Sequence, residues 1–215
     1  MISWGFLGAG SIAKSALAPA VHAASNATLR AVASRDRERA QGLSPHTVYE
    51  RYEDLLSDPT IDAVYISLAN DQHCRWSVAA MAAGKHVLCE KPIALDFAQV
   101  QEMADAAKKY DRVLVEAVWS QWHPRFIRAV ELIQAGAIGK LTGIDSSFCF
   151  TKNFTDNYRL DPAMGGGSLL DVGVYLAHAW AALHPSALNL QISSVEENIS
   201  TSGVDLTTKI SGRLG

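Results

Sequence analysis

Polar side chains follow an apolar run near the middle of this sequence, at a place where a parallel sheet would present them to a ligand. Val87–Cys89 reads as a buried strand and is followed by Glu90, Lys91 and Pro92. A lysine at a ligand-facing strand end must be paired or used, and its ammonium can stabilise negative charge on a reacting oxygen. We therefore take Lys91 as a candidate catalytic residue, with Glu90 beside it. Pro92 restricts the backbone of Lys91, the residue before it.

A glycine-rich segment near the N-terminus has the pattern of a phosphate-binding loop. Gly8, Gly10 and Ala13 form a GxGxxA motif that follows an apolar run and opens a helical pattern. The first glycine permits a tight turn, the second lets the backbone approach a pyrophosphate, and the small third residue lets helix and strand pack closely. N–H groups at the helix start, around Ser11 and Ile12, would face the phosphates. The motif predicts a dinucleotide site; a glycine turn without function is the alternative.

The residues after the second apolar run bear on the choice of cofactor. An NAD enzyme usually has an acidic residue there, for the ribose 2′-hydroxyl. Here Ser34 and Arg35 come first, so a 2′-phosphate would be accepted by the serine and paired by the arginine, with Arg39 as a further cation. Asp36 stays open as a displaced acid, and Arg37 is expected on a solvated helix face. The pattern favours NADP, with NAD possible.

Strands and helices alternate over residues 1–122, as is typical of a parallel sheet covered on both faces. We expect strands at 2–7, 29–33, 63–68, 86–89 and 113–118, and helices at 12–24, 37–43, 52–57, 72–83 and 97–110. Ligands of such sheets bind beyond the carboxyl ends of the strands. Asn70 and His73 follow one of these ends and are further cofactor candidates. The alternatives are an N-cap role for Asn70 or Asp71 and a structural role for the histidine.

The pattern changes after residue 122, where we place the start of a second domain, 123–215. Helices are expected at 124–134 and 169–183, and strands at 142–150, 191–196 and 204–210. The last of these alternates apolar and polar residues, as a half-buried antiparallel strand does. The pattern stops at Gly215, so this domain is expected to be incomplete, with the sequence a fragment; a domain completed by a partner is the alternative.

Composition narrows the class of protein. The chain has 215 residues and a formal net charge of −3, which gives no reason to expect a nucleic-acid partner. No apolar run reaches the ~20 residues of a membrane helix, and no signal peptide is recognised. The three cysteines have no metal-binding spacing, so we expect reduced thiols, no metal site and a cytoplasmic protein.

Four stretches of the chain resemble the Gfo/Idh/MocA oxidoreductase family: the GxGxxA motif, Asn70-x-x-His73, Glu90-Lys91-Pro92 and the GGGSLLDVGVY segment at 165–175. The resemblance is closest to the dimeric dihydrodiol dehydrogenase and NADP-dependent xylose dehydrogenase branch, on the strength of 115–119, Ser34–Asp36 and Tyr175. It implies an α/β fold, with an N-terminal doubly wound Rossmann sheet and an α+β domain whose open sheet is mostly antiparallel. It also implies homo-oligomers formed through that second sheet.

The resemblance further implies hydride transfer between a nicotinamide cofactor and a CH–OH group of a sugar, cyclic polyol or dihydrodiol. Lys91 and Tyr175 would form the proton-transfer site, with Asp171 beside them. Trp119 and Phe148 fall where related enzymes place apolar substrate walls; ordinary core packing is the alternative. A non-catalytic NADP-binding sensor or transcriptional co-regulator is the competing function.

Asp171, Tyr175 and His178 have the spacing i, i+4, i+7, which places them on one face of a regular helix. For Asp171 the alternative is a capping box with Ser168. For Tyr175 it is a buried ring with a bonded hydroxyl, and for His178 we favour packing or polarity near the cofactor.

Overall fold

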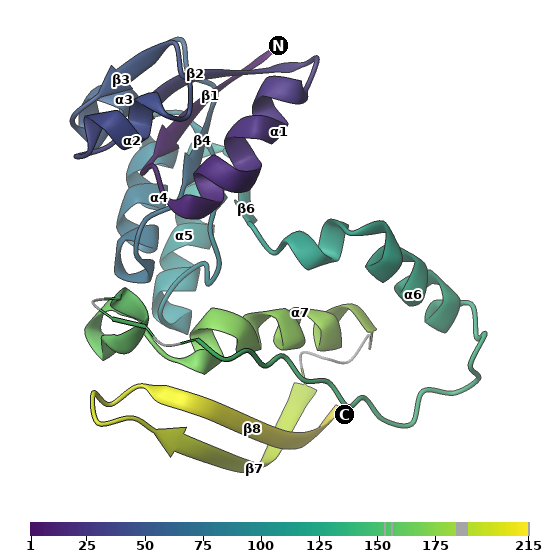
Figure 1. The fold of residues 1–215 in the computed structure, drawn as a ribbon. Helices are drawn as coiled ribbons and strands as arrows, with labels where there is room; N and C mark the ends of the chain where they lie inside the picture. The colour runs from purple at the N-terminus through teal and green to yellow at the C-terminus, as the bar shows by residue number, and fades with distance from the viewer. Residues whose placement is uncertain (153, 156, 184–188, 215) are drawn as a thin grey trace. The chain divides into compact units, whose positions relative to one another are not determined.

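The computed structural model describes residues 1–152, 154–155, 157–183 and 189–214, in two compact units, Met1–Ala117 and Val118–Gly215 (Figure 1). Among the residues described, no helix is both long and apolar enough to cross a membrane. The domain boundary that the sequence predicts, at 122/123, falls close to the division between the units.

The first unit is built on a six-stranded sheet in the order β3-β2-β1-β4-β5-β6, and every neighbouring pair is parallel. This is the strand order of dinucleotide-binding sheets, so the predicted Rossmann fold is confirmed. The sequence missed the short strand β3, which has only three residues. The strands are β1 (Ile2–Leu7), β2 (Ala27–Ala33), β3 (Thr47–Tyr49), β4 (Ala63–Ile66), β5 (His86–Cys89) and β6 (Leu114–Glu116).

Helices cover both faces of this sheet, and successive residues of a strand belong to different cores. Phe6 packs in the cluster with α1 and α2, whereas Leu7 packs in the cluster with α3, α4 and α5. Such two-sided burial explains why the strands lack polar alternation. The helices are η1 (Ala13–Leu17), α1 (Ala18–Ala23), α2 (Arg37–Gln41), α3 (Tyr52–Leu56), η2 (Asn70–Gln72), α4 (His73–Ala82) and α5 (Phe97–Tyr110).

The second unit combines helices with one antiparallel hairpin, β7 (Leu190–Ile199) and β8 (Asp205–Leu214). The strand predicted at 142–150 is wrong, because that segment lies without regular secondary structure. A strand needs a partner for its backbone groups, and β7 and β8 pair with each other. The helices are η3 (Trp119–Trp122), α6 (Pro124–Gln134), η4 (Tyr158–Leu160), η5 (Pro162–Met164), η6 (Leu169–Gly173) and α7 (Val174–Leu183).

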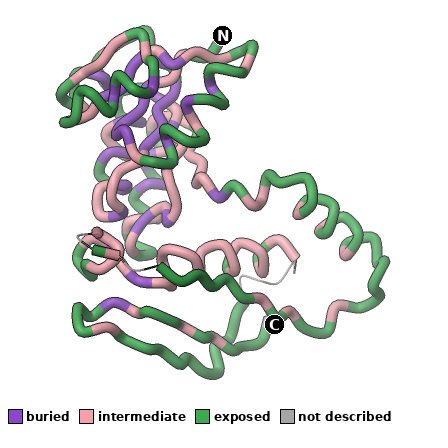
Figure 2. The backbone as a smooth tube through the Cα atoms, in the orientation of Figure 1, coloured by how far each residue is buried: buried purple, intermediate pink, exposed green. Residues whose placement is uncertain are grey.

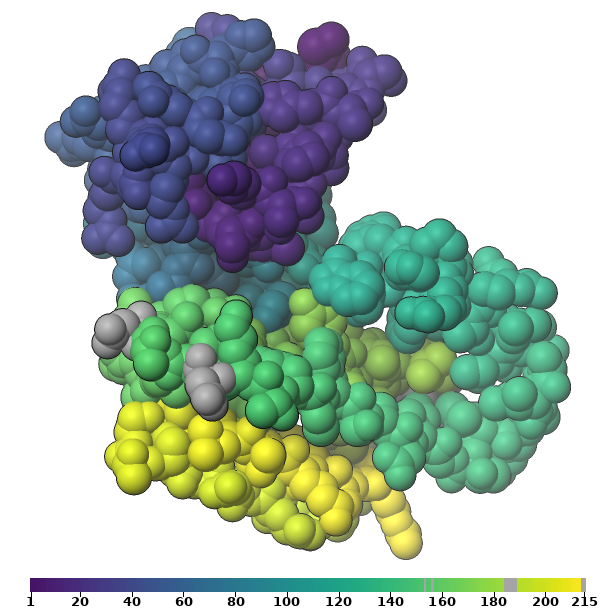
Figure 3. Space-filling model, in the orientation of Figure 1, coloured from purple at the N-terminus to yellow at the C-terminus, as the bar shows by residue number. Residues whose placement is uncertain are grey.

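Burial differs sharply between the units (Figure 2). Within the described part of the second unit, only Val118 and Val204 are buried hydrophobic residues. An open cavity of about 1610 Å³ lies among segment 141–150, α7 and the hairpin, which run from green to yellow in Figure 3. Of the residues that the sequence assigns to the substrate or to catalysis, Phe148 and Asp171 line this cavity, whereas Tyr175 and Trp119 do not.

Candidate active site

The phosphate loop takes the shape that its glycines predict. Gly8 has φ of +92°, and a Cβ built on it would lie 2.7 Å from the carbonyl oxygen of Ser67, just past β4. The turn itself therefore requires glycine at this position. Ala13 is fully buried, as close packing of helix and strand demands.

Gly10 is explained differently from Gly8. A Cβ at Gly10 would meet its nearest protein atom, the Ser67 carbonyl oxygen, at 3.4 Å, an ordinary contact. The protein itself leaves room for a side chain here. The absence of a Cβ is therefore explained by a phosphate that approaches the backbone of the loop. The hydrogen bond from Lys14 N–H to the Gly10 carbonyl spans one helical turn, so the N–H groups of Ser11 and Ile12 precede this ladder. The loop therefore fits a pyrophosphate.

The end of β2 presents cations. Asp36 caps α2 by accepting a 2.9 Å hydrogen bond from Arg39 N–H, and its own N–H donates to Ser34 Oγ at 3.1 Å. The N-cap role gives the acid a structural function, against the alternative of a displaced ribose ligand. Arg35 and Arg39 are exposed, and among the ion pairs of the described chain neither guanidinium is paired with an acidic side chain. Arg37 forms an exposed ion pair with Glu50 at 3.8 Å, in agreement with a solvated helix face.

His73 joins the segments that follow β4 and β5. Its Nδ1 lies 2.7 Å from the Pro92 carbonyl oxygen, and its Nε2 lies 3.2 Å from that of Leu68. The side chain is fully buried, and burial lowers the pKa of the imidazole. These contacts support the structural alternative, and a direct contact of His73 with the cofactor stays a prediction.

Asn70 is buried as well, and it opens the short helix η2. The helix expected from residue 72 is α4, whose N-cap position is occupied by Gln72, without a side-chain cap. Neither Asn70 nor Asp71 therefore occupies the N-cap position that the alternative assigned to them.

Glu90 and Lys91 lie at the end of β5. Tyr65, which is fully buried, donates a 2.6 Å hydrogen bond to Glu90 Oε1, and Lys91 N–H donates to Oε2 at 3.3 Å. Burial raises the pKa of the Glu90 carboxyl and outweighs these hydrogen bonds. Burial also raises the pKa of Tyr65. The sequence missed Tyr65, since a buried tyrosine in a strand reads as core.

A second carboxylate at this edge also escaped the sequence analysis. Glu116 ends β6, and its Oε1 accepts a 2.8 Å hydrogen bond from Ile93 N–H, just after the cis Lys91–Pro92 peptide bond. Its negative charge helps to raise the pKa of Glu90. Glu116 therefore holds the loop that carries Lys91.

In the second unit, Tyr175 lies against two aromatic side chains. Trp119 Nε1 donates a 3.1 Å hydrogen bond to the Tyr175 hydroxyl, and the two ring centroids are 6.0 Å apart. The Phe148 ring lies 5.3 Å from that of Tyr175. The structure thus brings together the three residues assigned to the substrate. Trp119 is more than an apolar wall, because it holds the phenolic oxygen.

The helix that carries Tyr175 begins differently from the prediction. The capping box is wrong, because Ser168 makes no side-chain cap. Asp205 of β8 takes that role, and its Oδ2 accepts from Leu169 N–H at 2.8 Å and from Ser168 Oγ at 2.6 Å. The first turn, η6, is a π-helix, so the assumption of one regular α-helix from 169 is wrong too. π turns of this kind are frequent at functional sites.

Asp171 and His178 have different partners. Asp171 forms an ion pair with Arg159, whose Nε lies 2.9 Å from Asp171 Oδ2. His178 Nδ1 pairs with Gln121 Nε2 of η3, a contact that fits the packing role favoured for it. Nothing in the sequence pattern marked Arg159. In the portion of the chain that is described, no three His, Cys, Asp or Glu side chains are grouped to hold a metal.

Comparison with known proteins identifies the family. A family model described as an oxidoreductase family with an NAD-binding Rossmann fold matches residues 2–118, and the GFO/IDH/MocA C-terminal domain matches residues 126–213. A D-xylose 1-dehydrogenase (NADP(+)) of Haloferax volcanii is 38% identical, over 82% of this chain and 55% of its own length. A trans-1,2-dihydrobenzene-1,2-diol dehydrogenase of Xenopus laevis is also 38% identical, over 67% of this chain and 45% of its own.

A solved structure agrees over nearly the whole chain. The 3-ketoreductase KijD10 of Actinomadura kijaniata, in complex with NADP and TDP-benzene, has a TM-score of 0.89 at 28% identity. The match covers 97% of this chain and 65% of that one, and the chain spans about half the length of the two curated relatives, 55% and 45%. On this evidence the chain belongs to the Gfo/Idh/MocA family of oxidoreductases and carries its NAD-binding Rossmann fold.

Proposed function

We propose that this chain is part of an NADP-dependent oxidoreductase that acts on the CH–OH group of a sugar, cyclic polyol or dihydrodiol, or on the matching carbonyl. The observation that carries the proposal is the hydrogen bond from Trp119 Nε1 to the Tyr175 hydroxyl, beside the Phe148 ring. In this arrangement the phenolic oxygen of Tyr175 accepts a hydrogen bond from Trp119, and the rings of Trp119 and Phe148 lie beside it.

Tyr175 would exchange the proton of the substrate hydroxyl. A phenol ordinarily titrates near pH 10, and donors or cations beside its oxygen stabilise the phenolate. The Trp119 indole is one such donor, and Lys91 is proposed to supply the cation and to bind the substrate oxygen. Acid–base assistance of this kind is worth about 10²–10⁴-fold in rate. Asp171 is proposed to complete this polar group, one helical turn before Tyr175.

The residues that would hold the cofactor belong to the first unit. NADP, when bound, supplies the nicotinamide carbon that exchanges a hydride with the substrate. The phosphate loop would take the pyrophosphate, and Ser34 and Arg35 the 2′-phosphate. The remaining proposed contacts are Arg39, Asn70, His73, Glu90 and Lys91, together with Ser11, Ile12 and Ala13 of the loop.

The substrate class rests on the aromatic side chains and on the relatives. Trp119 and Phe148 would suit the apolar face of a sugar ring or cyclic diol. The relatives named above act, by their names, on D-xylose and on trans-1,2-dihydrobenzene-1,2-diol. A Streptomyces violaceoruber relative, 34% identical over 94% of this chain, is a dTDP-sugar 3-reductase. These names make free and nucleotide-linked sugars, together with cyclic diols, the first compounds to test.

The test is reduction of NADP⁺ by the complete protein, followed at 340 nm, with aldoses, inositols and cyclic trans-diols. Turnover with one class, abolished by Tyr175→Phe, would support the proposal. Tight NADP binding without turnover, in either direction and on any of these compounds, would overturn it in favour of a nucleotide sensor.

Three further assignments are proposals of the same kind. We assign residues 1–122 to the cofactor domain and 123–215 to the start of the substrate and oligomerisation domain. The complete protein is expected to form a homo-oligomer through the sheet of that domain. The cytoplasmic location rests on the three unpaired cysteines.

A further inference from the structure

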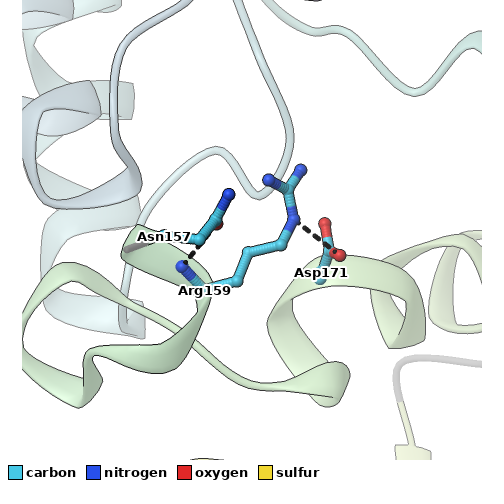
Figure 4. Close-up of polar contacts among 3 residues, drawn as sticks. All are labelled: Asn157, Arg159 and Asp171. Carbon is cyan, nitrogen blue, oxygen red and sulfur yellow. Dashed lines mark hydrogen bonds and ion pairs between the residues drawn. The ribbon is translucent and has the colours of Figure 1, made fainter. Parts of the chain in front are cut away.

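The ion pair between Arg159 and Asp171 is the least exposed of the ion pairs described in this chain (Figure 4). Its side chains are 29% and 14% exposed, whereas those of the Arg128–Glu131 pair are 66% and 56% exposed. Exposed pairs contribute little, but removing one partner of a desolvated pair leaves a charge without compensation. Loss of the Arg159 side chain would therefore leave the negative charge of Asp171 without its partner.

A closed ring of hydrogen bonds links the two residues. Arg159 Nε donates to Asp171 Oδ2 at 2.9 Å, and Asp171 N–H donates to the Gly167 carbonyl at 3.1 Å. Gly167 N–H in turn donates to the Arg159 carbonyl at 3.0 Å. Because the ring passes through both backbones and both side chains, the carboxylate cannot turn away without breaking part of it.

The glycine run makes this approach possible. A Cβ on Gly166 would lie 2.5 Å from the Arg159 carbonyl oxygen, so any larger residue would push the two segments apart. The N–H groups of Gly165 and Gly166 donate to the Pro162 and Asp161 carbonyls. The run is thus hydrogen-bonded along its length.

The backbone and the guanidinium of Arg159 have further contacts. The backbone N–H of Arg159 donates to Asn157 Oδ1 at 3.0 Å (Figure 4). The guanidinium carbon lies 4.7 Å from the centroid of the Tyr158 ring and 5.6 Å from that of Phe154. Arginine stacks well on such faces, and it presents donors in a rigid planar fork.

We propose that Arg159 is a positioning residue of the reaction, which keeps the Asp171 carboxylate fixed in one orientation, one helical turn before Tyr175. The inference rests on the proposed function, because it gives Asp171 a part in the chemistry. Lysine would keep the charge at position 159 but not the planar fork, whereas methionine would keep only the apolar stem.

The kinetic test uses the complete protein and the substrate found with the panel above. Arg159→Met should lower kcat by about 100-fold, the scale of a small misplacement of reacting groups, with KM and the Kd of NADP changed less than threefold. Arg159→Lys should recover part of kcat. Arg128→Met, which breaks the exposed pair, is the matched control and should leave kcat unchanged.

A double variant separates positioning from general destabilisation. Adding Arg159→Met to Asp171→Asn should cost no more than Asp171→Asn alone, since Arg159 acts through that carboxylate. Losses that multiply, or a loss confined to KM, would overturn the proposal.

A spectroscopic experiment tests the role of Arg159 without a substrate. If no substrate turns over, that result counts against the proposed function alone, and this experiment can still be made. In ¹⁵N-arginine-labelled protein, the Arg159 Nε–H should exchange with water much more slowly than that of Arg128. It should become fast in Asp171→Asn. Equally fast exchange of both protons in the unaltered protein would overturn the positioning role.

Discussion

Trp119 Nε1 donates a 3.1 Å hydrogen bond to the hydroxyl oxygen of Tyr175. The indole nitrogen is a donor only, so the phenol is the acceptor here and its own proton is not consumed by the contact. A donor that faces the oxygen favours the phenolate over the phenol. The aromatic neighbour of Tyr175 therefore has a polar role that composition alone could not reveal.

We expect Tyr175→Phe to abolish most turnover and Trp119→Phe to weaken it. The first change removes the exchanging hydroxyl and should lower kcat by about 10²–10⁴-fold. The second removes one hydrogen bond, worth about 0.5–1.5 kcal/mol, and should lower kcat by roughly 2- to 10-fold. Steady-state kinetics, with circular dichroism as the folding control, would check both; normal turnover in Tyr175→Phe would end its assignment.

Lys91→Met in the complete protein should lower turnover by roughly two orders of magnitude or more, the scale of lost acid–base assistance. The Kd of NADP should rise much less, because the phosphate loop and the end of β2 are unchanged. The loss in Lys91→Met/Tyr175→Phe should fall far short of the product of the single losses if the two residues act as a unit. A multiplicative loss would show that they act independently.

The end of β2 predicts tighter binding of NADP than of NAD. Ser34→Asp should reverse this order, because a carboxylate at this position would bind a ribose 2′-hydroxyl and repel a 2′-phosphate. Isothermal titration calorimetry with both cofactors measures the effect. Arg37→Ala, in the exposed pair with Glu50, is the control that should leave the ratio unchanged. An unaltered protein that prefers NAD would contradict the prediction.

Asp205 should contribute stability that depends on pH. Burial raises the pKa of its carboxyl, but hydrogen bonds from Ser168, Thr208 and Leu169 N–H outweigh burial and hold the pKa below its usual value. The contribution is thus present above the unfolded pKa of about 3.9 and is lost as the pH falls through the folded pKa.

Asp205→Asn should therefore unfold several degrees earlier than the unaltered protein at pH 7, since hydrogen bonds to a charged group are worth about 1.5–3 kcal/mol each. The difference should shrink as the pH is lowered below about 4. Asp145→Asn, at an exposed position of the same unit, should show no such trend in thermal unfolding scans. A difference independent of pH would refute the ionic part of the argument.

The hairpin predicts self-association. Ile192, Val195, Ile199 and Leu206 are all exposed on β7 and β8. Unpaired strand edges and exposed apolar side chains are liabilities in a monomer. Light scattering should show an oligomer of defined size for the complete protein and aggregation for residues 1–215 alone. Lysine at positions 192 and 199 should reduce association, and a stable monomer of the unaltered chain would contradict the prediction.

Local patterns predicted the first unit well because its strands are buried on both faces and its loop motif needs only neighbouring residues. The bounds of β1, β5 and α5 agree with the residues expected. The strand expected at 142–150 failed because β-propensity describes a residue's fit to a sheet, and no strand in the described part of the chain pairs with that segment.

The sequence by itself indicated the parallel α/β sheet and the phosphate loop, since these depend on short motifs and on periodic burial, whereas the pairing of Lys91 with Tyr175 was implied by the family resemblance and stays a prediction. Only the tertiary structure decided which groups meet over long separations in the chain. Trp119 reaches Tyr175 across 56 positions, and Asp205 caps Leu169 across 36. Such contacts depend on how the chain returns upon itself, and no local preference of either residue encodes them.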